Sequence, residues 1–434
     1  MKLFQIFYKY FYKLITILFY PVAFFLVIII RLISPILLIR WNCTVSTRIG
    51  HYVDNINIYL CEKDLKLHKV KTKTIDIFYD RPVICNKQIS KMWRRKIFFL
   101  PWFIMHPINT INEYFFDKIY NSNRKHELGY YRNLNNLEKY LIPPLSSFDS
   151  LNVQDKAEIQ LNFTNEEKIY AQKILKKIGI NDTSKVVSII IRDSNYLKKH
   201  YKNICWQQHA LRNTNFKYFQ KSAQLLANKN FKVIVYGDIS QKQKNLLKNN
   251  KNIFFYSESE ISSPFMDIFL LSRSYFVVSS TTGLDSVPFA FKIPIIEVGV
   301  VPFNLQRTYS NLYITLFKIY FSKTLNRNLT MSEIFDNNIH NIDGSDMIIN
   351  EIDFIHPSED DILDACLEMI DKINNKNDQS LENLEMQKIF NDKYAYYINK
   401  YFPKRSVLEN KGTVAKDFLK RNKFLIDLNI RINK

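Results

Sequence analysis

Five short apolar runs separated by amphipathic segments constrain the fold more than any other feature of this sequence. The runs cover residues 186–191, 231–236, 253–256, 275–278 and 293–298. Helical periodicity fills the intervals, at residues 216–227, 241–248, 265–272 and 284–291. Continuous apolar strands that alternate with helices are typical of a parallel sheet covered by helices on both faces. We therefore predict an α/β fold with a Rossmann-like domain in this part of the chain.

Polar residues lie at or just after the end of each of these runs. They are Arg192, Asp193, Gly237, Asp238, Glu258, Ser279, Ser280, Thr281, Thr282, Gly283 and Glu297. The carboxyl ends of parallel strands share one edge of a sheet, and ligands bind at that edge in open α/β sheets. We expect these residues to surround one binding site.

The hydroxyl-rich segment 279–283 is read as a tight turn between a strand and a helix N-terminus. Backbone N–H groups and the helix dipole at such a turn favour an anion such as a phosphate. Gly283 lets a ligand approach the backbone closely. The alternative is an ordinary turn whose hydroxyl groups only cap the helix.

Two arginine-bearing segments favour a diphosphate ligand. Arg192 ends the first strand, and Arg212 with Asn213 comes later. Guanidinium groups bind phosphates bidentately, so two arginines opposite the 279–283 turn would hold a nucleotide diphosphate from both sides. Alternatively, Arg192 forms a local ion pair with Asp193, and Arg212 is a solvated loop residue. The acceptors suited to ribose hydroxyls or a base edge are Asp238 and Glu258, which could instead cap the next helix.

Several classes of protein are excluded by what the sequence lacks. Only eight glycines occur, and no Walker loop or G-x-G-x-x-G motif can be built from them, which excludes P-loop kinases and typical dinucleotide enzymes. No D-x-D motif occurs, so we expect no metal and no other cofactor. Arginines and helix N-termini would then neutralise the charge of the diphosphate. The five cysteines are far apart and form no C-x-x-C motif, which predicts a reducing compartment and no structural zinc.

The N-terminal segment predicts a membrane anchor. Residues 14–30 carry no charge, Arg31 interrupts the segment, and residues 32–39 are again apolar. About 20 apolar residues are needed to span a bilayer, so a segment of this length can cross one. Pro21 and Arg31 also permit a kinked helix pair in one leaflet. A cleaved signal peptide is a third interpretation, but the apolar region is too long and lacks an A-x-A site.

The charge distribution suggests which side of the membrane the protein occupies. Arg31, Arg40 and Arg48 lie within or after the apolar segment, and no acidic residue precedes Asp54. This pattern favours keeping the bulk of the protein on the cytoplasmic face of the membrane. The net charge of +20 could reflect nucleic acid, an anionic membrane or compositional drift. Because the lysines are spread thinly and no nucleic-acid motif is present, we favour membrane plus drift and expect no nucleic-acid partner.

The chain of 434 residues is long enough for two or three domains. We predict an anchor at 1–40, a smaller α/β domain at 41–140, a linker at 141–165, a Rossmann-like domain at 166–375 and a helical tail at 376–434. In the first domain we expect a strand at 75–79, a helix at 86–96, a buried strand at 97–105 and a helix at 108–120. The alternative for 97–105 is a group of exposed aromatics at the membrane interface. Capping signals predict helices that begin after Thr164 and after Ser358.

Taken together, the motifs resemble a known family. They are Arg48-Ile-Gly-His51, Ile191-Arg192-Asp193 with Arg212-Asn213, Met266-Asp267, and Ser279–Gly283 leading to Val287-Pro288-Phe289. In this order, over Arg31 to Met369, they resemble bacterial glycosyltransferases encoded with surface-polysaccharide genes. The arginine-bearing strand end is also similar to the fucosyltransferase branch of the enzymes with two Rossmann-like domains, the GT-B type.

The resemblance implies two Rossmann-like domains behind an N-terminal membrane-associated helix. A nucleotide-sugar donor would bind the second domain, and the first would hold a glycan or lipid-linked acceptor. Asp267 and Ser286 join the candidate substrate-binding residues, as do Arg48 and Gly50. Fucosyltransferase-like sequences have a histidine where this chain has Ile190, so a role for that histidine does not transfer. Their Ser-Gly pair is here Thr282-Gly283, which keeps the hydroxyl.

A transferase of this kind needs a base for the acceptor hydroxyl. His51, with an unperturbed pKa of about 6.5, is the first candidate and Asp54 the second, with Arg192 as the catalytic cation. The alternative is that His51 is an ordinary loop histidine with its hydrogen bonds satisfied and no catalytic role. We therefore predict a metal-independent glycosyltransferase. A membrane-anchored assembly factor that binds nucleotide or glycan without transfer is the alternative, and a nucleic-acid binder is the third hypothesis.

Overall fold

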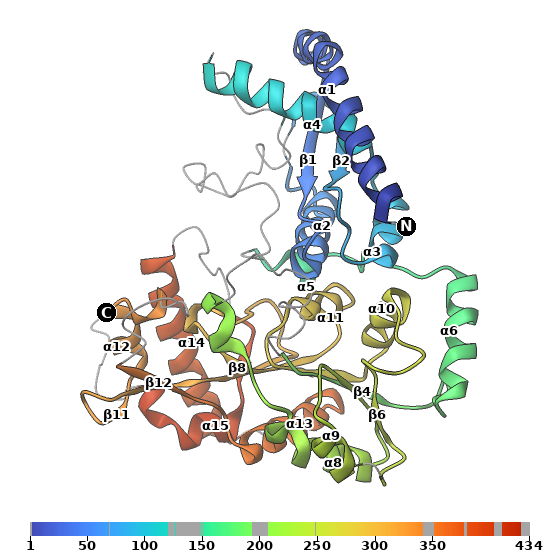
Figure 1. Ribbon diagram of the computed structural model, residues 1–434. Helices are drawn as coiled ribbons and strands as arrows, with labels where there is room; N and C mark the ends of the chain where they lie inside the picture. Colours follow the sequence, from blue (N-terminus) through green and yellow to red (C-terminus); the bar gives the residue numbers. More distant parts are fainter. Residues whose placement is uncertain are drawn as a thin grey trace. The chain divides into compact units, whose positions relative to one another are not determined.

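The computed structural model divides the chain into two units (Figure 1). The N-terminal unit contains Met1–Phe148 and Lys156–Asn162, and the C-terminal unit contains Asp149–Asp155 and Phe163–Lys434. The structure describes residues 2–68, 70–119, 126, 149, 151–192, 207–247, 249–341, 351–376, 380–402 and 410–426. Residues 141–148 and 150 of the predicted linker therefore lie outside the described residues.

The N-terminal unit is a small parallel sheet with helices. Its elements are α1 (Lys2–Ile33), β1 (Leu37–Thr44), α2 (Ile49–Asp64), β2 (Lys73–Asp80), α3 (Lys87–Arg94), β3 (Phe98–Phe99), α4 (Trp102–Ile111) and the π-helix η1 (Asn112–Ile119). The strands pair in parallel in the order β1-β2-β3. The predicted strand at 75–79 and helix at 86–96 are confirmed as β2 and α3.

The expected buried strand at 97–105 is wrong for most of its length. Only Phe98–Phe99 pairs with β2, and α4 starts at Trp102. Pro101 stands directly before the helix, where its fixed φ and missing N–H cost nothing. The buried residues Met105, Ile108 and Ile111 then recur at three-residue spacing, which suits one face of a helix.

The C-terminal unit is built on a seven-stranded sheet in the order β13-β9-β8-β7-β4-β5-β6, with every pairing parallel. The five predicted strands are confirmed as β4 (Val186–Ile190), β5 (Lys232–Tyr236), β6 (Ile253–Phe255), β7 (Phe276–Ser279) and β8 (Ile295–Val300). Two further strands, β9 (Tyr313–Phe317) and β13 (Thr413–Val414), were not predicted.

The strand order reverses between β4 and β7. The chain runs outward from β4 through β5 to β6, then returns to place β7 on the other side of β4, followed by β8 and β9. In a doubly wound sheet this reversal opens a crevice at the carboxyl ends of the two central strands, and ligands bind there. The fold thus marks the ends of β4 and β7 as the place to look for a site.

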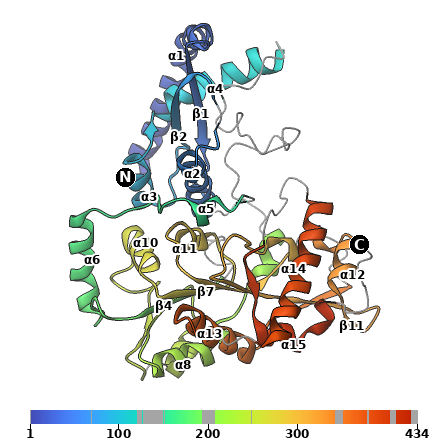
Figure 2. The same cartoon turned by 180° about the vertical axis from the view of Figure 1, so that it is seen from behind.

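Helices cover both faces of this sheet. Figures 1 and 2 show α8 (Gln220–Asn228), α13 (Glu359–Ile373) and α15 (Lys416–Arg421) on one face, and α10 (Pro264–Ser272) with α11 (Ser286–Ala290) on the other. The first face carries the largest apolar core, in which Val187, Ile189, Val278 and Ile296 are fully buried. The mixed α/β class with parallel sheets is therefore as predicted.

Local capping signals also hold. Thr164 caps α6 (Asn165–Lys177) and Ser358 caps α13, each as a reciprocal capping box. In the C-terminal tail, α14 (Leu381–Tyr401) begins after the N-cap Ser380. A second, antiparallel sheet of β10 (Ile319–Ser322), β11 (Arg327–Asn328) and β12 (Ile352–Ile355) was not predicted.

Candidate functional site

Direct hydrogen bonds join the carboxyl ends of β4 and β7. The backbone N–H of Arg192 donates to the Ser280 hydroxyl at 2.7 Å, and the N–H of Ser280 donates to the Ile190 carbonyl at 3.0 Å. The Ser280 side chain also donates to the Ile190 carbonyl at 3.2 Å. The structure thus brings the first arginine-bearing segment and the hydroxyl-rich turn together at the point where the strand order of the sheet reverses.

Most of the predicted hydroxyl ligands have roles within the turn itself. Asp285, only 2% exposed, accepts from the Ser279 hydroxyl at 2.5 Å and from the Thr282 hydroxyl at 2.9 Å. The Thr282 N–H donates to the second Asp285 oxygen at 2.8 Å. Burial raises the pKa of Asp285, and these hydrogen bonds oppose the rise. The Ser279, Ser280 and Thr282 hydroxyls therefore shape the turn.

Thr281 and Gly283 differ from their neighbours. Thr281 has a φ of +58°, and its hydroxyl has no hydrogen-bond partner in the described part of the chain. Gly283 is exposed at the tip of the turn. The segment that follows is the single 3-10 turn η5 (Gly283–Asp285) and then α11, which has five residues. The helix dipole invoked from the sequence is therefore smaller than expected, since few peptide units are aligned.

The second arginine-bearing segment is tied to the end of β4. The 3-10 helix η3 (Gln207–Arg212) ends at Arg212, and the N–H of Thr214, two residues on, donates to the Arg192 carbonyl at 3.2 Å. Arg192, Arg212, Asn213 and the 279–283 turn thus belong to one region of the C-terminal unit. Asp193 lies outside the described residues.

Lys318, which directly follows β9, fixes this segment, and the sequence interpretation missed it. Its ammonium group donates to the carbonyl oxygens of Leu211 at 2.6 Å and Asn213 at 3.3 Å. The side chain is almost buried, and burial lowers its pKa to about 8. A lysine inside the apolar run 313–321 was the available signal, because lysine is rarely buried without a reason.

His356, which follows β12, holds the same segment and was also missed. Its Nδ1 faces the Pro357 carbonyl at 2.8 Å, so Nδ1 donates and Nε2 accepts from the Thr214 hydroxyl at 2.7 Å. The imidazole stacks on Tyr218 with ring centroids 4.3 Å apart. Burial, helped by the charges of Lys318 and Lys217, lowers its pKa to about 4. His356 is therefore neutral at pH 7.

Gly237, after β5, lies beside the end of β4. Its N–H donates to the Ser257 hydroxyl at 2.9 Å, and its φ is +123°. A Cβ atom at this position would lie 2.7 Å from the Ile191 carbonyl oxygen. Only glycine fits here, so the chain can pass close to the segment that leads to Arg192.

The remaining predicted residues of the C-terminal unit lie in varied environments. Asp238 is exposed, and Glu258 pairs with Lys244 at 2.6 Å. Asp267 lies in the first turn of α10, where it accepts from the Tyr256 hydroxyl at 2.6 Å and burial raises its pKa to about 6. Glu297, on β8, is 4% exposed and sits in register beside Ser279.

Ser286 is buried at the start of α11. These contacts belong to the fold, so a ligand role for Glu258, Asp267, Glu297 or Ser286 stays a prediction. The same holds for Asp238.

The predicted acceptor-side residues all lie at the N-terminus of α2 in the N-terminal unit. Arg48 is the exposed N-cap, Gly50 and His51 are in the first turn and half-buried, and Asp54 is 1% exposed. His51 and Asp54 are three residues apart, so they lie on the same face of the helix. Their assignment as base and acceptor groups stays a prediction.

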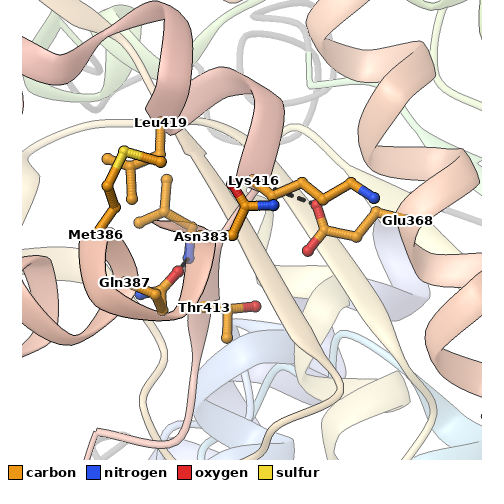
Figure 3. Close-up of a pocket in the computed structure, with 8 residues that line it drawn as sticks. Glu368, Asn383, Met386, Gln387, Thr413, Lys416 and Leu419 are labelled. Carbon is orange, nitrogen blue, oxygen red and sulfur yellow. Dashed lines mark hydrogen bonds between the residues drawn. The ribbon is translucent and has the colours of Figure 1, made fainter. Parts of the chain in front are cut away.

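Among the described residues, no group of three or more histidine, cysteine or acidic side chains is placed to hold a metal ion. A cavity of about 10 Å³ lies where α13, α14, β13 and α15 meet, with room for about one water (Figure 3). Beside it, the Lys416 N–H donates to Glu368 at 2.8 Å, and the Val414 N–H donates to Gln387 at 2.9 Å. These contacts fasten the tail to the sheet, so we interpret this cavity as a packing feature.

Comparison with known proteins gives structural similarities only. No protein-family model matches the sequence, and no curated protein matches it. A family 9 glycosyltransferase from Veillonella parvula is 11% identical, with 64% of this chain and 85% of that chain covered at a TM-score of 0.39.

Two Escherichia coli enzymes are also similar. Heptosyltransferase WaaC with ADP is 9% identical, with 64% of this chain and 91% of that chain covered at a TM-score of 0.33. ADP-heptose lps heptosyltransferase II is 12% identical, with 60% and 84% covered at a TM-score of 0.32. These three are not fucosyltransferases, so the fucosyltransferase likeness stays a prediction. Identity and TM-score are both low, so these similarities do not assign a function.

Proposed function

We propose that this protein is a glycosyltransferase that moves a sugar from a nucleotide-sugar donor to a membrane-linked or nascent cell-surface glycan. The observation that carries the proposal is the meeting of Arg192, the Arg212–Thr214 segment and the 279–283 turn at the reversal point of the parallel sheet. An open α/β sheet binds nucleotides at this position.

The chemistry of these residues suits a diphosphate leaving group. Departure of the sugar leaves negative charge on the phosphate oxygens, and guanidinium groups stabilise it through bidentate hydrogen bonds. Arg192 and Arg212 would supply these bonds. Lys318 adds a positive charge that its backbone carbonyl partners do not neutralise. The role of these cations does not require a metal ion, in keeping with the metal-independent transfer we propose.

The acceptor side of the proposal rests on the N-terminal unit. His51 would remove the proton from the acceptor hydroxyl as the sugar–phosphate bond breaks, with Asp54 as the second candidate. The apolar segment Leu14–Ile33, of mean hydropathy 2.5, supports a membrane location, and the basic residues around it support the cytoplasmic face of the inner membrane.

Nucleotide binding is the first test. Purified protein is titrated with ADP, GDP, UDP and CMP, and membranes are then assayed with the corresponding labelled nucleotide sugars. We expect one nucleotide to raise the melting temperature and its sugar conjugate to be consumed. Failure of every nucleotide to bind and of every donor to react would reject the proposal. Binding that survives in Arg192→Ala, with full complementation of the cell-surface glycan, would instead favour the non-catalytic assembly factor.

A further inference from the structure

One face of α1 is apolar and exposed along the helix. Large exposed residues recur at three- or four-residue spacing and continue just past the helix end; they are Leu14, Leu18, Val22, Phe25, Ile29, Leu32 and Ile36. Ile17 and Phe24, next to Leu18 and Phe25 in the sequence, are exposed as well. Phe25 is 65% exposed and Leu32 is 74% exposed. A contiguous apolar stripe of this length marks an interaction surface.

The opposite face of α1 is packed against the rest of the N-terminal unit. Ala23 and Val27 are fully buried in a core with Met105, Ile108 and Ile111. The Arg31 side chain also donates to the Asn112 side chain, at the start of η1, at 2.8 Å. The helix therefore has one protein-facing side and one open side, whereas a helix that crosses a membrane alone has lipid all around it.

The open apolar surface continues from α1 onto η1. The rings of Phe24 and Phe115 meet edge to face with centroids 5.9 Å apart, and Tyr114 contacts Phe115 in the same manner at 5.3 Å. Tyr114 is 56% exposed and Phe115 is 40% exposed. Two segments about 90 residues apart in sequence thus share one aromatic-rich surface, the α1–η1 face.

We propose that the α1–η1 face lies in the plane of the membrane, with its side chains in one leaflet, and that α1 does not cross the bilayer. This inference concerns the mode of membrane binding and does not depend on the proposed sugar transfer.

The alternative arrangement carries a cost. If α1 crossed the bilayer while packed on α4, part of η1 would enter the hydrocarbon with it, including Glu113. A charged side chain within the hydrocarbon of a bilayer is costly. An in-plane arrangement avoids this cost, because amphipathic helices lie at the level of the headgroups with only one face in the acyl chains.

A lipid surface is the occupant that the composition favours. The stripe consists of large aliphatic and aromatic residues, and aromatic side chains are enriched at membrane interfaces. Lys2, Lys9 and Lys13 precede the stripe, and the first acidic residue of the chain is Asp54. Basic residues beside an apolar face suit a bilayer with anionic headgroups.

The location of the N-terminus tests the inference most directly. Epitopes are placed at the N-terminus and, as the control, at the C-terminus of the full chain, and proteolysis is compared in intact spheroplasts and inverted vesicles. An in-plane α1 leaves both epitopes on the same side, so both are cut only in inverted vesicles. A crossing α1 leaves them on opposite sides, and that result would overturn the proposal.

Flotation with vesicles of phosphatidylethanolamine and phosphatidylglycerol tests which residues form the surface. We expect Phe25→Glu combined with Leu32→Glu to lower the floated fraction at least tenfold, and Phe115→Glu alone to lower it about threefold. Leu384→Glu, at a similarly exposed position on α14, is the matched control and should float like the wild type. Unchanged flotation of Phe115→Glu would remove η1 from the surface. A wild-type protein that stays in the aqueous fraction as a dimer would show that a second copy covers the face.

Discussion

Arg40 of the N-terminal unit and Lys318 of the C-terminal unit are both buried cations, but their partners differ in charge. In the N-terminal unit Arg40 forms two hydrogen bonds with Asp76, at 2.7 and 2.8 Å, and Arg94 contacts Asp80 at 2.6 Å. Burial alone would raise the pKa of Asp76, but its bonds to Arg40 outweigh burial and lower it. These arginines are neutralised by carboxylates, and their role is to hold β1, β2 and α3 together.

In the C-terminal unit Lys318 donates to backbone carbonyl oxygens, which carry no net charge. Its positive charge therefore remains at the carboxyl end of the sheet, close to the segment that carries Arg212. A buried cation with neutral partners destabilises a fold unless an anion comes near it. Arg40 therefore stabilises the fold, and we propose that Lys318 serves binding.

Arg40→Met is expected to have the largest effect and to spare nucleotide binding. Removal of Arg40 leaves Asp76 buried without its main cation, which costs about 3–5 kcal/mol. Urea unfolding of the N-terminal unit measures the loss, and nucleotide titration of the same sample should give the wild-type affinity. Arg95→Met, at an exposed position in the same unit, is the control. An equal loss of nucleotide affinity in Arg40→Met would break the division between the units.

Arg192→Ala is expected to lower the rate of sugar transfer and to leave the stability of the fold nearly unchanged, the reverse of Arg40→Met. Its effects on the fold should be small, because the hydrogen bonds that link residue 192 to Ser280 and Thr214 use the backbone. The rate of sugar transfer should fall about 100-fold, the usual effect of removing one donor that stabilises a leaving group. The rate for Arg192→Lys should lie between those of the wild type and Arg192→Ala, since lysine keeps the charge and loses the bidentate geometry. Wild-type turnover by Arg192→Ala would contradict the assignment.

His356 should make the C-terminal unit sensitive to acid. The unfolded histidine gains a proton near pH 6.5, whereas the folded residue does so only near pH 4. The unfolded state therefore binds more protons between these values, and stability present above pH 6.5 is lost as the pH falls toward 4, by about 3 kcal/mol.

The variant His356→Gln, which can still accept from Thr214, should lose less stability over this interval. Urea unfolding at a series of pH values measures both slopes. Equal slopes for the two proteins would show that His356 is not held neutral.

Lys318→Met is expected to have a smaller effect, about tenfold weaker nucleoside diphosphate binding, as one charge and its hydrogen bonds are lost. Wild-type affinity should also fall as the pH rises through about 8, where the ammonium group loses its proton. The Met variant should not show this fall. Lys323→Met, on the surface and paired with Asp353 at 3.0 Å, is the matched control. Identical titrations of both variants would place Lys318 outside the binding site.

Much of the C-terminal fold could be predicted from the sequence. Strands β4 to β8 are fully or partly buried, so they are continuous apolar runs, and each is separated from the next by a helix. β9 was missed because no α-helix stands between it and β8, which breaks the alternation. In the N-terminal unit, the apolar run at 97–105 fits both a strand and a buried helix, and periodicity over so short a run does not separate them.

The site could be predicted only as far as strand ends reveal it. Arg192 and the 279–283 turn follow recognisable strands, so their approach to each other could be inferred. Lys318 and His356 follow β9 and β12, which were not recognised, so nothing assigned them to the same edge. The role of Asp285 had a signal, since Thr282 and Asp285 have the spacing of a capping box.

The buried carboxylate of Asp285 has one further consequence. Because it fixes the Ser279 and Thr282 side chains through hydrogen bonds, the 279–283 turn has its shape before any ligand arrives. Ligands that order a flexible loop lose conformational entropy of the chain on binding, and a rigid loop avoids that loss. Asp285→Ala removes these hydrogen bonds. Ligand binding to the variant should therefore have a more favourable enthalpy and a less favourable entropy than binding to the wild type, a difference that calorimetry can detect.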